Sequence, residues 1–306
     1  MGLICGFTTR NFSFLKTYCA CRRGEQPFKM WHTRKLLFVA IIFTALCDKV
    51  TAQLLDMGPN SGDFLYEACR EEVLKKVIDS GLLRQELEQS QSFQKAWNTS
   101  GTCSELIPGG TKEHTTALLT YLKADEDFIK EFNQAMVTNG ANESTYENDF
   151  HFKSLHFLIM DSLMLLKPNE CKTVYLSVDG QKKLPLGSKK RLSGFTKAFL
   201  SYKDMMKHDD PYDRTLFNIT SCFFATLGKN ICAQEDVALL SQAEVFTVRT
   251  VNKIITDDDE YTVIALESAG ERSTDICHIF SRSPADVSTQ WLVLTLVALS
   301  LFVFNC

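Results

Sequence analysis

A polar triplet, Gln234, Glu235 and Asp236, stands directly before the apolar run VALL. Carboxylates placed at the start of a strand could stabilise positive charge that develops in a transition state. The triplet could equally be a solvated turn that only precedes a strand. The surrounding sequence therefore has to decide between a working carboxylate pair, a degraded one and a plain turn.

Other reactive residue types lack the spacing that their chemistry requires. No Cys-x-x-Cys or His-Glu-x-x-His pattern occurs, so we expect no metal. Gly228 and Lys229 lack the spacing and the following Ser or Thr of a phosphate-binding loop. His151 and His156 stand in an apolar stretch, where histidine is more often a packing or capping residue than a ligand. The net charge of -4, without an aromatic-interleaved basic patch, gives no reason to expect nucleic acid as a partner.

The N-terminal region resembles a secretory signal. Basic residues precede the apolar run LLFVAIIFTALC, and the small-residue pattern VTA ends at Ala52. We therefore expect residues 1–52 to be a leader, with Met1 or Met30 as its first residue. The mature chain would start near Gln53 and enter the secretory pathway.

The C-terminal run WLVLTLVALSLFVF is apolar, but it is shorter than the roughly 20 residues of a membrane-spanning helix. Small residues near Ser281 and a polar spacer precede it, which is typical of a signal replaced by a GPI anchor. We expect attachment at Ser281, removal of residues 282–306, and an ectodomain of residues 53–281 on the extracellular face. A short membrane anchor that stays on the chain is the alternative.

Secretion would place the cysteines in an oxidising compartment, where they are more often bridged than metal-bound. The mature chain would keep an even number of the 11 cysteines, which suits disulfides, but the sequence does not choose the pairing. These cysteines are Cys69, Cys103, Cys171, Cys222, Cys232 and Cys277. Sequons at Asn98, Asn142 and Asn218 predict a glycoprotein.

The order of the expected elements predicts an α+β domain. Apolar residues recur at helical spacing over residues 63–98, 114–122, 127–136 and 150–166. After Pro168 the chain changes to short β-branched and aromatic runs, the strongest being KTVYLSV, RTLFNITSCFF, VALL, EVFTVRTV and EYTVIALES. Helices followed by strands indicate one α+β domain and not a doubly wound sheet.

Several segments together resemble the vertebrate ecto-mono-ADP-ribosyltransferase family. In order, they are LLDMGPNSGDFLYEAC, FHFKSLHFLIMDSLMLL, CKTVY, GFT, TLFNITSC and AEVFTV, over residues 54–277. The resemblance implies a helical N-terminal part and two roughly perpendicular β-sheets that enclose an NAD cleft. It implies transfer of ADP-ribose from the substrate NAD to a protein arginine. It also implies disulfides joining Cys69 with Cys277 and Cys171 with Cys222, and leaves Cys103 and Cys232 as a possible third pair.

The expected cofactor-binding residues depart from the family pattern. Family members have an arginine after Val-Tyr, which would hold the pyrophosphate, but Leu176 stands there. Lys172 or Lys182 could supply a point charge, although a shift of one residue turns a strand side chain to the opposite face. The family serine falls near Asn230, and with Thr196 of the GFT segment we expect it to contact NAD.

The polar triplet has two registers against the family's Glu-x-Glu loop. Aligned on the apolar strand, Gln234 is first and Asp236 takes the essential second position, one methylene short. Glutamine in the first position implies NAD hydrolysis in preference to arginine transfer. In the second register, which is counted back from Glu244, Glu235 takes the first position of the Glu-x-Glu loop and Val237 takes the essential second one. In this register no catalytic carboxylate is left.

Two functions therefore stay open. The first is an extracellular NAD hydrolase or arginine transferase, with Asp236 or Glu235 as the transition-state carboxylate. Its activity would be weak, because a misplacement of about 1 Å can cost about 100-fold in rate. The second is a catalytically silent cell-surface glycoprotein that keeps the fold for binding or display.

Overall fold

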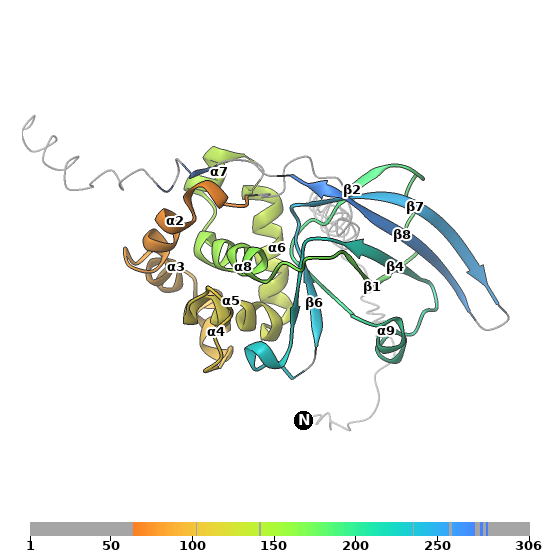
Figure 1. Cartoon of the computed structure of the whole chain (residues 1–306), viewed down its shortest axis with the longest axis horizontal. Coiled ribbons are helices and arrows are strands. Elements are labelled where there is room, and N and C mark those ends of the chain that lie inside the picture. Colours follow the sequence, from red (N-terminus) through yellow and green to blue (C-terminus); the bar gives the residue numbers. More distant parts are fainter. Residues whose placement is uncertain are drawn as a thin grey trace, which may run out of the picture. The chain divides into compact units, whose positions relative to one another are not determined.

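The computed structural model describes residues 64–101, 103–140, 142–234, 236–256, 259–272, 276–277 and 280 (Figure 1). The expected leader, the anchor residue Ser281 and the C-terminal apolar run lie outside these residues. Within them, no helix combines the length and the apolar character that crossing a membrane requires.

The first half of the described chain is helical, as its periodicity predicted. Its elements are η2 (Glu67–Cys69), α2 (Arg70–Val77), α3 (Leu82–Gln89), α4 (Gln91–Thr99), α5 (Lys112–Lys123), α6 (Glu126–Asn139), α7 (Glu143–Asn148) and α8 (Lys153–Leu166). Local side chains fix several starts. The Ser90 hydroxyl accepts a hydrogen bond from the Phe93 N–H at the start of α4, and the Asp125 carboxylate accepts one from Phe128 at the start of α6.

Helix α8 is the centre of the helical layer, and its residues 154–163 are all buried. A helix that is apolar all round must be covered on every side. Its N-terminus is closed by Glu86 of α3, whose carboxylate oxygens accept hydrogen bonds from the backbone N–H of Lys153 at 2.9 Å and of Ser154 at 2.8 Å. Burial raises the pKa of Glu86, and these two bonds oppose that rise.

The second half forms two sheets and confirms the α+β prediction. The strands are β1 (Lys172–Asp179), β2 (Lys189–Arg191), β3 (Thr196–Ala198), β4 (Arg214–Ser221), β5 (Phe224–Leu227), β6 (Val237–Leu240), β7 (Glu244–Ile255) and β8 (Glu260–Glu271). A five-stranded sheet has the order β1-β4-β8-β7-β2, and a three-stranded sheet has the order β3-β6-β5. Only the β4–β8 pair is parallel among these described pairings. Helix α9 (Tyr202–His208) and the short η3 (Lys229–Ile231) connect strands.

Two apolar cores lie on the two faces of the three-stranded sheet. Because strand side chains alternate between faces, Leu239 of β6 and Ala225 of β5 pack with the helices. Their neighbours Ala238, Leu240 and Phe224 pack against the five-stranded sheet. The sheet that carries the polar triplet at one of its ends is therefore held from both sides.

Three disulfides join segments that are distant in the sequence. They connect Cys69 with Cys277, Cys103 with Cys232, and Cys171 with Cys222. The first two pairs tie the helical layer to the C-terminal end and to the loop between β5 and β6. The structure thus contains both pairs that the family resemblance implied and also the third pair.

Candidate functional site

The candidate site lies where β1, β3 and β6 meet. Ala198 of β3 pairs with Ala238 of β6. The next residue along β3, Phe199, forms a two-way backbone bridge with Tyr175 of β1, with N–O distances of 2.7 and 2.8 Å. Leu176, the residue after Tyr175, shares an apolar cluster with both alanines. The bridge therefore brings Leu176 towards the start of β6, which directly follows the polar triplet.

Leu176 faces an apolar interior. It is 8% exposed and stands opposite Phe217 of β4. Half-buried Val178, Leu184 and Leu200 pack against the same cluster. The side chains around Leu176 are hydrocarbon, and they offer no charge to a pyrophosphate.

The two lysines considered as substitutes lie elsewhere. Lys172 stands opposite Ser221, at the far end of β1 and about 13 Å along the strand from Leu176. Lys182 follows the end of β1, and its backbone N–H donates to the Thr215 hydroxyl at 2.8 Å. Neither backbone position lies beside Leu176.

The Asn230 side chain folds back on its own loop. Its Oδ1 accepts a hydrogen bond from the Gly228 N–H at 2.8 Å, and its Nδ2 donates to the Thr226 carbonyl at 3.2 Å. Thr196 is buried on β3, where its hydroxyl donates to the Gly194 carbonyl at 3.2 Å. Both groups have backbone partners in this structure, and their contact with NAD stays a prediction.

Of the polar triplet, Gln234 and Asp236 are exposed in the loop of the β5–β6 hairpin, and Glu235 lies outside the described residues. The Asp236 carboxylate rests against Gly228, since a Cβ at Gly228 would lie only 1.8 Å from Asp236 Oδ1. Glycine is required for this approach. Strand β6 begins after the triplet, with the half-buried Val237 opposite Leu227.

Glu244 is a buried carboxylate whose role the sequence did not indicate. It accepts hydrogen bonds from the Ser221 hydroxyl and from the Cys222 N–H, the latter at 2.7 Å. Burial raises its pKa, while these bonds oppose the rise. Glu244 therefore fastens the start of β7 to the corner between β4 and β5, which is a structural task. The only available signal was a glutamate within an apolar strand.

The histidine expectation is confirmed for His156, which is buried in α8. Its Nδ1 lies 2.7 Å from the Tyr66 hydroxyl and 3.2 Å from the Tyr146 hydroxyl, and its Nε2 lies 2.8 Å from Gln242 Nε2. This polar cluster links the helices to the β6–β7 connection. His151 is exposed in the turn before α8 and is not a packing residue.

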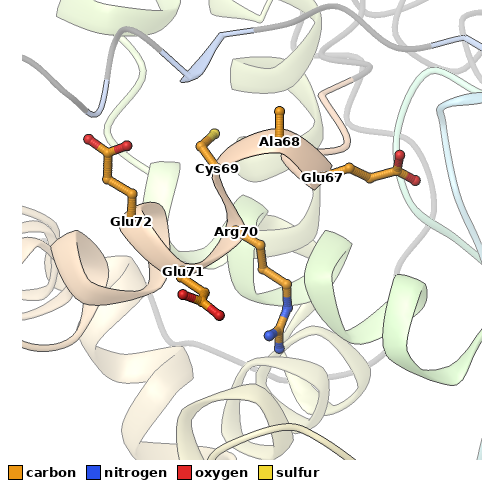
Figure 2. A pocket seen from close by; sticks show the side chains of 6 residues that line it. All are labelled: Glu67, Ala68, Cys69, Arg70, Glu71 and Glu72. Atoms are coloured by element: carbon orange, nitrogen blue, oxygen red, sulfur yellow. The ribbon is translucent and has the colours of Figure 1, made fainter.

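An open hollow of about 540 Å³ lies at the start of α2 (Figure 2). Its lining is formed by Glu67, Ala68, Cys69, Arg70, Glu71 and Glu72. The Arg70 guanidinium donates to Asp161 at 2.6 Å, and His114 Nε2 lies 2.8 Å from the second oxygen of Asp161. Burial would raise the pKa of Asp161, but the hydrogen bonds from His114 and Arg70 lower it. No residue predicted for NAD chemistry lines this hollow.

Comparison with known proteins places this geometry in a family. A family model described as NAD:arginine ADP-ribosyltransferase matches residues 55–274. The "GPI-linked NAD(P)(+)--arginine ADP-ribosyltransferase 1" of Mus musculus is 29% identical over 258 residues, which cover 78% of this chain and 77% of that protein. The "Ecto-ADP-ribosyltransferase 5" of Homo sapiens is 28% identical over 212 residues, covering 63% of this chain and 70% of that protein.

Solved structures show the same architecture. A mutant of the eukaryotic mono-ADP-ribosyltransferase ART2.2 in complex with NAD superposes with a TM-score of 0.55 at 26% identity, covering 72% of this chain and 96% of that chain. A second ART2.2 mutant, in complex with NADH, gives a TM-score of 0.54 with the same identity and coverage. The family match spans most of the described domain, and the two-sheet fold agrees with it. This chain belongs to the NAD:arginine ADP-ribosyltransferase family.

Proposed function

We propose that this chain is a cell-surface member of the family that keeps the fold for binding or display and has lost efficient NAD cleavage. The observation that carries the proposal is the buried Leu176, 8% exposed, at the position where the family pattern has its phosphate-binding arginine. Arginine holds a pyrophosphate through a charged, bidentate fork. A leucine packed among hydrocarbon side chains provides neither charge nor donor.

The state of the carboxylate loop supports the same proposal. Asp236 rests against Gly228 before the strand begins, and Val237 is the first residue of β6. Cleavage of the nicotinamide bond needs a fixed negative charge beside the ribose, where positive charge develops. A short aspartate turned onto its own hairpin is poorly placed to supply that charge.

The cell-surface part of the proposal rests on sequence signals and on the printed names of relatives. The leader at residues 1–52, glycans at Asn98, Asn142 and Asn218, and a lipid anchor at Ser281 would give an extracellular glycoprotein tied to the membrane. The Mus musculus relative is described as GPI-linked. Its partners would be NAD as a bound ligand, or a protein recognised by the displayed domain.

A second candidate function is slow NAD hydrolysis, or transfer of ADP-ribose to a protein arginine. It is favoured by the exposure of Gln234 and Asp236 on a hairpin that the Cys103–Cys232 disulfide holds in place. An amide and a carboxylate would then stand in a fixed, accessible loop. In this alternative Asp236 or Glu235 acts as the transition-state carboxylate.

The test is nicotinamide release from labelled NAD by the purified full chain. We expect release no faster than in a protein-free blank, and no further loss in an Asp236→Ala, Glu235→Ala double variant. A rebuilt Leu176→Arg, Val237→Glu variant is expected to gain turnover, whereas each single change is not. Turnover by the natural chain that disappears in the double alanine variant would overturn the proposal in favour of the slow enzyme.

A further inference from the structure

Lys197 stands on a face of the three-stranded sheet that is otherwise apolar. It pairs directly with Leu239 of β6, which in turn pairs with Ala225 of β5. Directly paired residues point to the same side of a sheet. Leu239 and Ala225 belong to the core that faces the helices, so Lys197 is directed towards the helical layer.

The position of the ammonium group agrees with this direction. Lys197 Nζ donates a hydrogen bond to the carbonyl of Leu122, in the last turn of α5, at 3.3 Å. Such a bond is long, since N–H to O bonds usually span about 2.7–3.2 Å. The C-terminal end of a helix attracts a cation, but one long bond leaves most of the donor capacity of a lysine unused.

The charge of Lys197 lacks an ionic partner within the described part of the chain. Burial lowers the pKa of Lys197, and no charged neighbour is among the causes of that shift. The Lys197 side chain is nevertheless exposed, so a ligand can reach it. An ammonium group that lacks a counter-ion is stabilised by an incoming anion.

Val237 is the diagonal neighbour of Lys197 on this face. Lys197 pairs with Leu239, and Val237 lies two residues before Leu239 on β6. Diagonal neighbours in a sheet lie about 7–8 Å apart. One alignment of the polar triplet expects a carboxylate at Val237, so at this place the chain has a neutral side chain beside an ammonium. The positive charge of Lys197, without a carboxylate at Val237, disfavours a positive charge that develops nearby and favours the binding of a phosphate.

We propose that Lys197 forms an anion site for a phosphate or pyrophosphate group at the β3–β6 junction, on the side that faces the end of α5. The ammonium acts as a point charge with free donors, which is the way lysine binds phosphate. The inference goes beyond the proposed function, because such a site does not depend on whether NAD is cleaved.

The experiment measures stabilisation of the full chain against thermal unfolding by inorganic pyrophosphate and, separately, by NAD, at matched ionic strength. Lys197→Met is expected to raise the Kd for pyrophosphate about 10-fold to 100-fold, because it removes a hydrogen bond to a charged group. Lys197→Arg is expected to bind nearly as well as the natural chain. Lys189→Met, at an exposed lysine of β2, is the control and is expected to change nothing.

A pH series separates this role from a merely structural one. The pKa of Lys197 is lowered, so its ammonium group loses its proton at a pH below the ordinary lysine value of about 10.4. Binding of pyrophosphate to the natural chain is therefore expected to weaken already before the pH reaches that value. Lys197→Arg is expected to keep its binding over the same range. The comparison of the natural chain with Lys197→Arg can be made even if Lys197→Met does not fold.

The outcomes divide cleanly. Saturable stabilisation by both pyrophosphate and NAD supports the Lys197 site and identifies a dinucleotide as a source of the anion. Stabilisation by pyrophosphate alone supports the site with a free anion as its ligand. Equal weakening in Lys197→Met and Lys189→Met, or no stabilisation by either probe, overturns it. Nicotinamide release from the same samples reports separately on the proposed loss of turnover.

Discussion

Glu86 shows how a single side chain can serve a distant element. It closes the N-terminus of α8 from 67 residues away along the chain, using both carboxylate oxygens. The first N–H groups of a helix have no partner within it, so a buried helix start must receive acceptors from elsewhere. A negative charge at this end also complements the helix dipole.

We expect Glu86→Ala to lower the free energy of unfolding by about 2–4 kcal/mol, because two buried N–H groups lose their acceptors at once. Urea unfolding followed by circular dichroism measures the change. Glu88→Ala is the matched control, since Glu88 lies exposed on the same helix. Equal effects of the two substitutions would show that the carboxylate does not close α8.

No local rule could have predicted this contact. The sequence shows only a glutamate in a polar helix, and its two partners lie beyond four further helices. The same limit applies to Glu244, which meets its donors Ser221 and Cys222 only when β4 and β7 join the same five-stranded sheet. Leu176, by contrast, could be singled out in advance, because the Val-Tyr before it marks its place in the strand.

The length of a helix or strand decided whether the sequence could predict it. Long periodic helices such as α8 and long strands such as β7 and β8 repeat their pattern often enough to be recognised. Strands β2 and β3 have only three residues each, and α9 is a short helix, so none of them shows a period. Because β3 forms one wall of the candidate site, the site could be predicted less fully than the fold.

The β5–β6 hairpin depends on the Cys103–Cys232 disulfide. Its loop contains η3 and the polar triplet, and Cys232 is its covalent link to the helical layer. We expect a Cys103→Ser, Cys232→Ser double variant to lose up to about 4 kcal/mol of stability in the chain-entropy model. Amide hydrogen exchange should rise first in residues 228–236, whereas α8 should stay protected.

The control for this prediction is the natural chain under the same non-reducing conditions. Uniformly faster exchange in both the loop and α8 would indicate global destabilisation and would contradict a local role of the disulfide. Unchanged exchange in the loop would show that the backbone bonds within it suffice.

Across the described domain, helices α2–α8 lie on one side of β6 and the five-stranded sheet lies on the other, with α9 beside β1 (Figure 1). The last described residues belong to the helical side, since Cys277 is bonded to Cys69 and the Phe280 ring packs 5.8 Å from that of Tyr66. A lipid anchor after Phe280 would therefore hold the domain by its helical side and leave the β7–β8 hairpin away from the membrane.

Phosphatidylinositol-specific phospholipase C is expected to release the protein from intact cells, because the anchor would be a lipid and not a spanning helix. Flow cytometry before and after treatment measures the surface fraction. A chain in which residues 282–306 are replaced by a genuine spanning helix is the resistant control. Retention of the natural chain after treatment would favour the short membrane anchor instead.

The Cys69–Cys277 bridge also sets an order of events during synthesis. Cys69 and Cys277 are 208 residues apart. At a translation rate of about 5–20 residues per second, Cys277 is therefore synthesised roughly 10–40 s after Cys69. Cys171 and Cys222 are separated by only 51 residues and can pair much earlier. For most of the translation of the domain, Cys69 is therefore an unpaired thiol. It can react with oxidoreductases or form a disulfide with the wrong cysteine. A chain truncated before Cys277 can never complete that closure.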